Sequence, residues 1–440
     1  MYLSLMVLSL ITFIITVALM ICLIIFKPTI SIGKISFQTF WIVTLAGALV
    51  VLCTNQIDLN SLWSSLTGGK MNPIKILVLF ISLSMISISL DELNFFNFLS
   101  TQALKKSKGS QYKIFFTIYF LVAILTIFTS NDIVILTFTP FIISFSKKAK
   151  INPLPFLICE FVNANTYSML LSIGNPTNIY LAGSENISFT YYLSKMWLPT
   201  LFAGLSTLGV ILLIFRKDLS KKIEDIEIEE VSLKNKPLVI INLVVLAITT
   251  VLLVISNYIS LEMWIICLSS MVVMSVVLLV YSIKAKNKDY LFKTYKRLPY
   301  NLIPFILSMF ILVLSLKQNG VISYLQEALD YLSVNSIAES FSYTISSTLF
   351  DNVINNIPMS VLYSSILEGK SELAIFSTII GSNIGAYLTP IGALAGIMWM
   401  SILKKHEVKF NFMSFVKYGI ILVPVALISS TLGIWLMCGI

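Results

Sequence analysis

Four clusters of polar and helix-breaking residues interrupt long apolar stretches of this sequence. Pro and Gly unwind helices and free backbone N–H and C=O groups, which at membrane depth is tolerated only inside protein or beside a wet cavity. Freed N–H groups can hold an anion or a polar oxyacid, whereas freed carbonyls and Asn amides can hold Na⁺. The clusters therefore predict a site for a small polar or anionic solute, with H⁺ or Na⁺ as coupling ion and no other cofactor. They are Thr129-Ser130-Asn131-Asp132, Gly174-Asn175-Pro176-Thr177-Asn178, Asp351-Asn352-Val353-Ile354-Asn355-Asn356-Ile357-Pro358, and Gly381-Ser382-Asn383-Ile384-Gly385 with Leu388-Thr389-Pro390-Ile391-Gly392.

Asp132 stands out among these residues, because a carboxylate near the middle of a bilayer is costly unless it is solvated or paired. We expect it to carry the coupling proton or to help bind a cation; the alternative is a cap that bonds N–H groups at a hairpin tip. Glu160 is either a second ionisable relay group or a residue near the cytoplasmic face, and Asp351 could support the second hairpin. The predicted solute- and ion-binding residues are Ser130, Asn131, Asn175, Thr177, Asn178, Asn355, Asn356, Ser382, Asn383 and Thr389, and the predicted helix breaks include Gly174, Pro176, Pro358, Pro390 and Gly392.

Each cluster also has a purely structural interpretation. Pro and Gly can merely kink a helix, and Asn and Ser can bond neighbouring helices to one another. Four such clusters at positions related by an internal repeat favour a binding site over four separate kinks.

The elements that carry the clusters are predicted to be membrane-spanning helices. Of 440 residues, 57% are hydrophobic and only 12% are charged, against about a quarter charged in soluble domains. The apolar runs do not alternate with polar residues, which favours helices over a β-barrel, and the first run is too long for a signal peptide. The sequence thus predicts an all-α polytopic membrane protein with spans at 3–26, 37–53, 74–90, 153–183, 195–215, 237–256, 262–283, 301–316, 372–400 and 416–438, and re-entrant hairpins at 113–147 and 336–367.

Several function classes are not supported by the sequence. The five cysteines show no metal or redox spacing, and we expect no metal site. No nucleophile–base pair is evident, so we expect no enzyme. No phosphate-binding loop is present, which argues against an ATP-driven pump in this chain and leaves a separate ATPase subunit open.

The basic residues predict the orientation. With the N-terminus outside, 25 of the 30 Lys and Arg residues fall on the cytoplasmic side, and only Lys70, Lys75, Lys195, Lys317 and Lys370 fall outside. This asymmetry explains the net charge of +9 without a nucleic-acid partner. It places both termini outside a plasma (inner) membrane. Segment 113–147 is basic at both ends, so we expect it to enter from the cytoplasm and return there.

An internal repeat relates the two halves of the chain at an offset of 224 residues. Ser84-Met85 recurs as Ser308-Met309, Asn131-Asp132 as Asn355-Asn356, and Thr207-Leu208-Gly209 as Thr431-Leu432-Gly433. Each half has five full spans and one hairpin. Because five is odd, the second repeat must be inverted, and the two hairpin tips should converge near the midplane. We expect a first repeat at 1–220, a charged cytoplasmic linker at 216–236 and a second repeat at 237–440.

These motifs resemble the arsenite/antimonite efflux permease family, within the wider ion transporter superfamily of citrate-type and dicarboxylate carriers and some sodium/proton antiporters. The resemblance covers nearly the whole chain. The segments that carry it are Ile88-Ser89-Leu90-Asp91-Glu92, Asn131-Asp132 with Leu136-Thr137-Phe138-Thr139-Pro140, Asn355-Asn356-Ile357-Pro358, and Gly381 to Gly385 with Leu388 to Ala395.

The resemblance implies paired hairpins, a homodimer and an elevator-like movement. It also implies that Asn131, Asp132, Asn355, Asn356, Thr389 and Pro390 lie at or near the site. The chain departs from the arsenite family at Ser130 and Ile133, around the Asn-Asp pair, and at Asn383 and Tyr387, where the family usually has Asp and Lys.

The functional hypothesis is a secondary transporter embedded in the lipid bilayer that exports an arsenite- or antimonite-like oxyacid in exchange for protons. The alternatives are a sodium-coupled di- or tricarboxylate or other organic-anion carrier, a sodium/proton antiporter and, less suited to paired hairpins, a channel.

Overall fold

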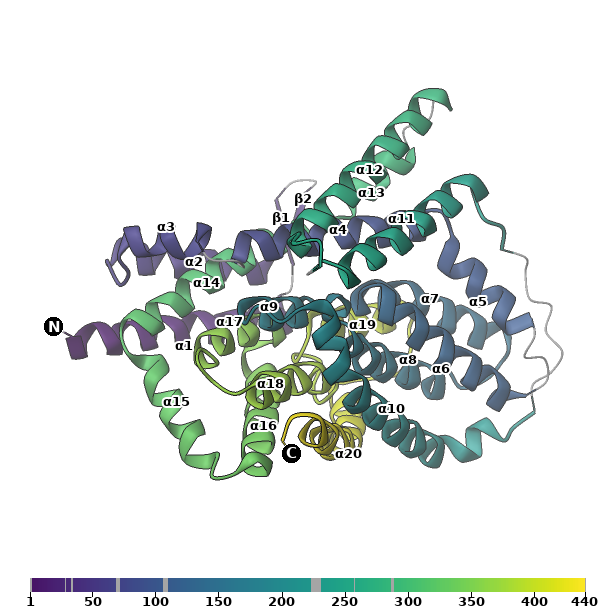
Figure 1. Ribbon diagram of the computed structural model, residues 1–440. Coiled ribbons are helices and arrows are strands. Elements are labelled where there is room, and N and C mark those ends of the chain that lie inside the picture. The colour runs from purple at the N-terminus through teal and green to yellow at the C-terminus, as the bar shows by residue number, and fades with distance from the viewer. Residues whose placement is uncertain are drawn as a thin grey trace.

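The computed structural model describes residues 2–27, 29–32, 35–68, 72–105, 110–222, 231–256, 258–285 and 289–439. Almost all of these residues form helices (Figure 1). Within this part of the chain, seven helices are each long and apolar enough to cross a membrane. The prediction of an all-α polytopic membrane protein is therefore confirmed.

The described residues of the first half form ten α-helices, two 3₁₀ turns and a short antiparallel β-hairpin that the sequence analysis did not predict, with Thr29 opposite Gln38. Its elements are α1 (Tyr2–Phe26), β1 (Thr29–Ile32), β2 (Ile35–Gln38), α2 (Thr39–Cys53), α3 (Leu59–Thr67), α4 (Pro73–Glu92), α5 (Phe95–Lys105), α6 (Gln111–Phe128), α7 (Asn131–Lys148), α8 (Leu154–Tyr167), η1 (Ser168–Leu170), η2 (Ser172–Gly174), α9 (Pro176–Ser184) and α10 (Phe189–Leu219).

The second half repeats the order of the main elements: a hairpin, a broken helix and a final long helix. Its elements are α11 (Lys236–Val254), α12 (Met263–Lys284), α13 (Asp289–Lys296), α14 (Leu302–Gln318), α15 (Val321–Leu332), α16 (Ser336–Ile354), α17 (Asn356–Ile366), α18 (Glu372–Ile384), η3 (Gly385–Tyr387), α19 (Leu394–Lys405) and α20 (Phe412–Cys438).

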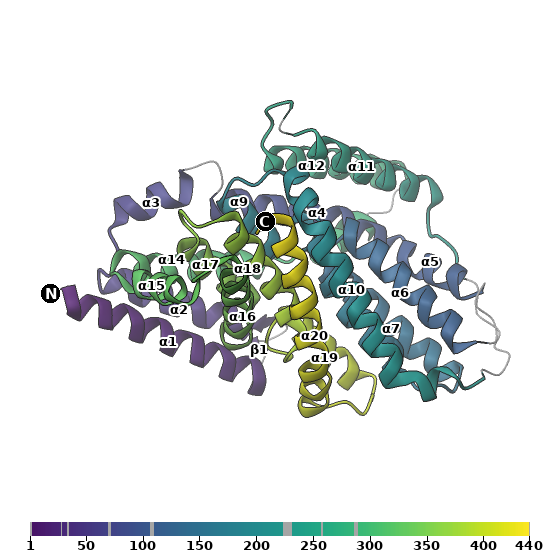
Figure 2. The ribbon, with the colours of Figure 1, turned by 60° about the horizontal axis from the view of Figure 1, so that its bottom comes forward.

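The two hairpins, α6–α7 and α16–α17, lie on different sides of the body, with α6–α7 to the right and α16–α17 left of centre in both views (Figures 1 and 2). The final long helices of the halves, α10 and α20, pack side by side between them (Figure 2). Their contact is close, because a Cβ at Gly433 would lie 2.9 Å from Pro199 Cα. The repeat boundaries and the membrane orientation remain predictions, and residues 223–230 of the predicted linker lie outside the described residues.

Some predicted spans are not single helices. Segments 153–183 and 372–400 are each divided by 3₁₀ turns. The span predicted at 301–316 is the single helix α14, and the chain then bends by 78° into α15 at Gly320, where φ is 78°. Helix α6 alone is long enough to cross a membrane, and α7 follows it after a break of two residues. The two lie side by side, as a hairpin requires (Figure 1).

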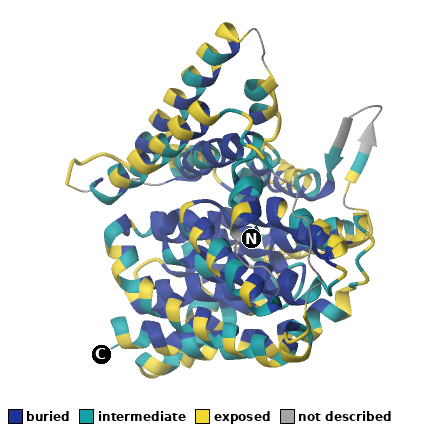
Figure 3. Ribbon diagram, turned by 90° about the vertical axis from the view of Figure 1, so that its right-hand side faces the viewer, coloured by how far each residue is buried: buried dark blue, intermediate teal, exposed yellow. Residues whose placement is uncertain are grey.

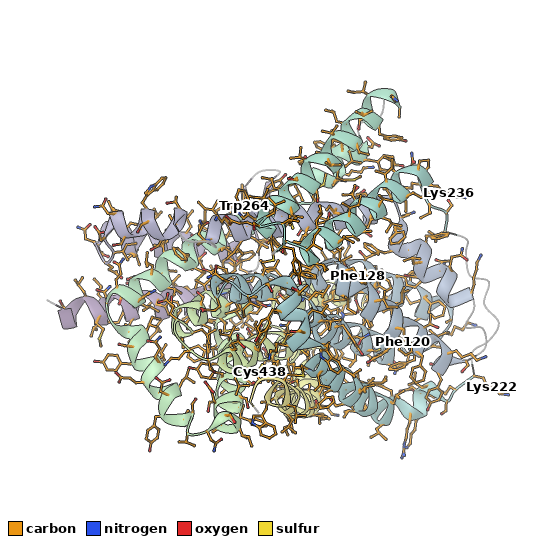
Figure 4. All side chains as sticks on the ribbon, viewed as in Figure 1. Phe120, Phe128, Lys222, Lys236, Trp264 and Cys438 are labelled. Atoms are coloured by element: carbon orange, nitrogen blue, oxygen red, sulfur yellow. The ribbon has the colours of Figure 1, made fainter. Side chains whose placement is uncertain are left out.

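Burial separates a central body from helices at the periphery (Figure 3). Helix α8 is buried over nearly its whole length, and so are α9, α17 and α18. By contrast, only 22% of the most apolar 18-residue stretch of α12 is buried. On α6, Phe120 and Phe128 point outward (Figure 4) and are 57% and 43% exposed. Apolar surface on this scale suits contact with lipid.

Candidate functional site

The tip of the first hairpin is the break at Thr129-Ser130, between α6 and α7. Asn131 Nδ2 donates to Asn165 Oδ1 at 3.1 Å, and Asn165 Nδ2 in turn donates to the carbonyl of Phe161 at 2.8 Å. This chain of donors fixes the orientation of the Asn131 amide. Its Oδ1 atom and the Ser130 hydroxyl are therefore buried without a protein partner among the described residues.

Asp132 lies in the first turn of α7, where the helix N-terminus favours a negative charge. Its side chain is partly exposed. Within the described part of the chain its carboxylate accepts no hydrogen bond, so it does not cap the turn as the structural alternative supposed.

The tip of the second hairpin is Asn355, between α16 and α17. It has φ 76° and ψ 154°, a backbone conformation that costs a non-glycine residue about 1–3 kcal/mol. Asn355 Nδ2 donates to the Ile391 carbonyl at 2.8 Å, and the Asn356 N–H donates to the Gly392 carbonyl at 3.0 Å. These bonds attach the tip to the unwound segment before α19. The Oδ1 atoms of Asn355 and Asn356 are buried without protein partners in the described structure.

Asn352 joins the same hairpin to the same unwound segment. Its Oδ1 accepts bonds from the Thr389 N–H at 3.0 Å and the Thr389 hydroxyl at 2.7 Å. Its Nδ2 donates to the Gly385 carbonyl at 3.0 Å. Thr389, predicted to bind solute, is thus bonded within the protein. Pro390 and Gly392 lie in this unwound segment.

The two broken helices meet at a crossing of hydrogen-bonded side chains. Asn383 Oδ1 accepts bonds from Ser168 Oγ and Asn175 Nδ2, both at 3.0 Å, and Asn383 Nδ2 donates to Asn178 Oδ1 at 2.6 Å. The Thr177 and Ser382 hydroxyls lie 3.2 Å apart. We call this set the crossing: Ser168, Asn175, Thr177, Asn178, Ser382 and Asn383.

The crossing and the tips differ in how their polar groups are used. Each tip is bonded to the broken helix of its own repeat, and the broken helices are bonded to each other. No hydrogen bond joins one tip directly to the other within the described residues. Five residues predicted to bind solute, namely Asn175, Thr177, Asn178, Ser382 and Asn383, instead bond to each other, whereas Ser130, Asn131, Asn355 and Asn356 retain unpartnered oxygens.

The breaks lie at positions somewhat different from those predicted. Helix α18 continues through Gly381, Ser382 and Asn383 to Ile384. Gly381 serves packing instead, because a Cβ there would lie 1.9 Å from Ser347 Oγ on α16. Pro358 is in the first turn of α17, where its missing N–H costs nothing.

In the first repeat the unwound segment begins upstream of the predicted cluster, at Ser168. Gly174 ends η2, and its tight packing against the Ser168 carbonyl leaves no space for a Cβ. Asn175 caps α9 by accepting a bond from the Thr177 N–H at 3.2 Å, and Pro176 is the first helical residue.

Among the described residues, two carboxyl groups are completely buried. Glu160 on α8 lies inside the protein, with Thr139 Oγ1 at 2.9 Å from its Oε1 and Trp399 Nε1 donating to its Oε2 at 3.2 Å. Asp351 on α16 has neither oxygen bonded within the described residues, so it does not support the hairpin through hydrogen bonds.

The acidic end of α4 lies against the first hairpin. Asp91 accepts a bond from the Thr137 hydroxyl of α7 at 3.1 Å and pairs with Arg297 at 2.7 Å. Glu92 pairs with the same Arg297 at 2.6 Å. The sequence analysis identified Asp91-Glu92 as a motif but did not foresee its cationic partner after α13, or the supporting roles of Asn165, Asn352 and Trp399. For Asn165 and Asn352, the only signal in the sequence was an Asn one helical turn from a broken segment.

Comparison with known sequences gives one matching family and several named relatives. A family profile described as citrate transporter matches residues 5–379. The arsenical pump membrane protein of Escherichia coli is 25% identical over 400 residues, which cover 87% of this chain and 90% of the relative. The arsenical pump membrane protein of Yersinia enterocolitica is 26% identical over 358 residues, covering 78% of this chain and 82% of the relative.

Two solved structures share the fold. The YdaH transporter of Alcanivorax borkumensis superposes with a TM-score of 0.56 at 12% identity, over 98% of both chains. MtrF of Neisseria gonorrhoeae, described among antimetabolite efflux pumps, gives a TM-score of 0.59 at 12% identity over 99% of this chain and 95% of its own. Both are membrane transporters, and the similarity extends over the whole described molecule.

Proposed function

Because this chain belongs to the citrate transporter family and is a membrane transporter, we propose that it exports a small, uncharged oxyacid of the arsenite or antimonite type in exchange for protons. The two relatives described above are named arsenical pump membrane proteins, which supports a transporter rather than an enzyme. The arsenical pump names of those relatives support the substrate class.

The observation that carries the proposal is the set of unpartnered oxygens at the hairpin tips. The Asn131 and Asn355 amides are oriented by bonds from their Nδ2 atoms, so that their Oδ1 atoms remain free to accept. Asn356 Oδ1 and Ser130 Oγ are likewise unpartnered in the described structure. A buried acceptor without a donor is costly, and a ligand that supplies donors relieves that cost.

Arsenous acid supplies such donors. It is mostly uncharged at neutral pH and carries three hydroxyl groups, which can donate to the amide oxygens of the tips. Citrate would instead present several negative charges, and the four polar clusters contain no Lys or Arg to meet them. Asp132, partly exposed at the first tip, is the group to which we assign the exchanged proton.

A sodium-coupled carrier is the second candidate. Amide and hydroxyl oxygens are also ligands for Na⁺. Both H⁺ and Na⁺ should therefore be tested as the coupling ion. We further propose a homodimer in the plasma membrane with both termini outside, with or without an ATPase subunit.

Transport into inverted membrane vesicles tests the proposal. We expect arsenite to accumulate under an imposed proton gradient, and accumulation to fall at least tenfold in Asp132→Asn. The matched control is Asp330→Asn, which makes the same chemical change at an exposed residue that pairs with Lys370.

Each result has a distinct meaning. Proton-driven arsenite accumulation that is lost in Asp132→Asn and retained in Asp330→Asn supports the proposal. Absence of arsenite movement under both proton and sodium gradients contradicts it. Sodium-driven uptake of a carboxylate in the same vesicles supports the second candidate.

A further inference from the structure

Asp351 is a carboxyl group inside the second hairpin with no evident stabilising partner. It lies on α16, one turn before the tip residue Asn355, and its exposed fraction is 0%. Neither Oδ1 nor Oδ2 has a hydrogen-bond partner within the described residues, and no Lys or Arg pairs with it there. A bare carboxylate in such a place is among the most costly groups that a protein can bury.

The carboxyl group points toward the broken helix of its own repeat. A Cβ built on Gly385 would lie 2.8 Å from Asp351 Oδ2, so only glycine leaves room for this approach. The neighbouring Asn352 holds the Gly385 carbonyl at 3.0 Å. Asp351 is therefore fixed between the hairpin and the segment where α18 ends, next to the proposed solute site.

The groups around Asp351 do not neutralise it. The titratable side chains on the nearest elements are Glu339 and Tyr343 on α16, Tyr363 on α17 and Tyr387 in η3. Glu339 lies in the first turn of α16 and accepts a bond from Ser371 Oγ, and Tyr343 and Tyr363 have unpartnered hydroxyls among the described residues. The charged residues on the helices packed against α16 are Glu372 on α18, Lys417 on α20, and Glu327 and Asp330 on α15. None of them bonds to the Asp351 carboxyl group.

Glu160 shows what a satisfied buried carboxyl group looks like in the same protein. It has a hydroxyl and an indole N–H within hydrogen-bonding distance. Burial alone therefore does not explain the bare oxygens of Asp351; they match a group whose partner is a small exchangeable ion.

We propose that Asp351 is a binding site for a monovalent cation, H⁺ or Na⁺, carried by the second hairpin. It is additional to Asp132 and lies in the other repeat. The inference deepens the proposed function, on which it rests for its role in coupling, but ion binding to the site is measurable without any solute.

Thermal unfolding of the purified full-length protein tests this site. Wild type, Asp351→Asn, Asp132→Asn and the control Asp330→Asn are compared in sodium and potassium salts, at mildly acidic and mildly alkaline pH. If the ion is H⁺, the wild-type melting temperature falls as pH rises, since ionisation leaves a bare buried charge. If it is Na⁺, sodium salt raises the alkaline melting temperature by several degrees.

In either case at least half of the dependence should disappear in Asp351→Asn and remain in Asp330→Asn. An Asp351→Asn protein that keeps the wild-type response to pH and to Na⁺ overturns the proposal. Should this variant not fold, labelling of the wild type by a hydrophobic carbodiimide, located by mass spectrometry, takes its place. Labelling of Asp351 that decreases as pH rises, or as Na⁺ is added, supports the site. Labelling that is absent, or that changes neither with pH nor with Na⁺, overturns it.

The vesicle assay separates this inference from the proposed function. If the purified protein shows Asp351-dependent ion binding but its vesicles transport no arsenite, the proposed function is wrong and the ion site stands. Arsenite transport whose ion dependence is unchanged in Asp351→Asn rejects the site and keeps the function.

Discussion

The crossing of the broken helices and the tips of the hairpins are built from the same residue types but use them differently. At the crossing, Asn383 engages Ser168, Asn175 and Asn178 at once. At the tips, the Nδ2 groups of Asn131 and Asn355 donate hydrogen bonds within the protein. Their Oδ1 atoms have no partner in the described structure. The crossing therefore holds the two repeats together, whereas the tips are suited to a ligand. Asparagine in a membrane helix indicates neither role until its partners are known.

The largest effect should come from Asn383→Ala. It leaves the buried Asn178 Oδ1 and Asn175 Nδ2 atoms without a partner, whereas Ser168 Oγ keeps its bond to the Asn165 carbonyl. Each buried unsatisfied group costs about 1–3 kcal/mol. We expect a loss of at least about 3 kcal/mol in stability, measured by thermal unfolding of the purified protein. A melting temperature equal to that of the wild type would contradict the structural role of the crossing.

Glu160, like the residues of the crossing, has hydrogen-bond partners inside the protein, so its loss should lower stability. Two variants at this position should differ clearly in stability. Glu160→Ala removes the acceptor of the buried Trp399 N–H and leaves a cavity, so we expect a loss of about 2–3 kcal/mol. Glu160→Gln keeps both bonds, because its amide can donate to Thr139 and accept from Trp399. The free energy of unfolding of the Gln variant should lie within about 1 kcal/mol of that of the wild type. Equal losses in the two variants would show that the carboxyl group itself is required at this position, since Gln keeps the size of Glu and can form both hydrogen bonds.

The tips should show the opposite pattern. Asn356→Ala removes an oxygen that has no protein partner, so stability should change by less than about 1 kcal/mol. Arsenite accumulation in vesicles should nevertheless fall at least tenfold if this oxygen receives a solute hydroxyl. A variant with full transport activity would place the solute elsewhere. Matched expression and melting temperature are the controls that exclude misfolding.

The smallest effect should come from Glu185, which lies outside the spans in the connection after α9. It lines a crevice of about 210 Å³ with Glu368 and Lys317, and Lys317 pairs with Glu368. Burial, and then the nearby charge of Glu368, raise the pKa of Glu185 from 4.5 to about 7.

Because the folded protein holds this proton more tightly than the unfolded chain, Glu185 should contribute stability below about pH 4.5 that is lost as pH rises toward about pH 7. Glu185→Gln should slightly reduce the fall in melting temperature across that interval and leave transport unchanged. A pH profile identical to that of the wild type would mean that other groups dominate it.

Much of the fold follows from the sequence because the bilayer imposes simple rules. Apolar runs of about 20 residues must be helices, and the runs around 74–90, 195–215 and 416–438 lie within α4, α10 and α20. The basic ends of 113–147 predicted a chain that turns back, and α6 and α7 lie side by side. The β-hairpin after α1 and the bend between α14 and α15 had no comparable signal, because short polar connections obey no bilayer rule.

The sequence alone determined which residues are polar within apolar surroundings: the Asn pairs, Asp132, Glu160 and Asp351. Only the tertiary structure decided which of them are satisfied, because a side-chain hydrogen bond depends on atoms brought together from distant parts of the chain. Glu160 and Trp399 are 239 residues apart, and Asn175 and Asn383 are 208 apart. No local pattern predicts such pairs. The long-range bonds thus distinguish a joint at the crossing from the bare oxygens at Asp351 and the hairpin tips.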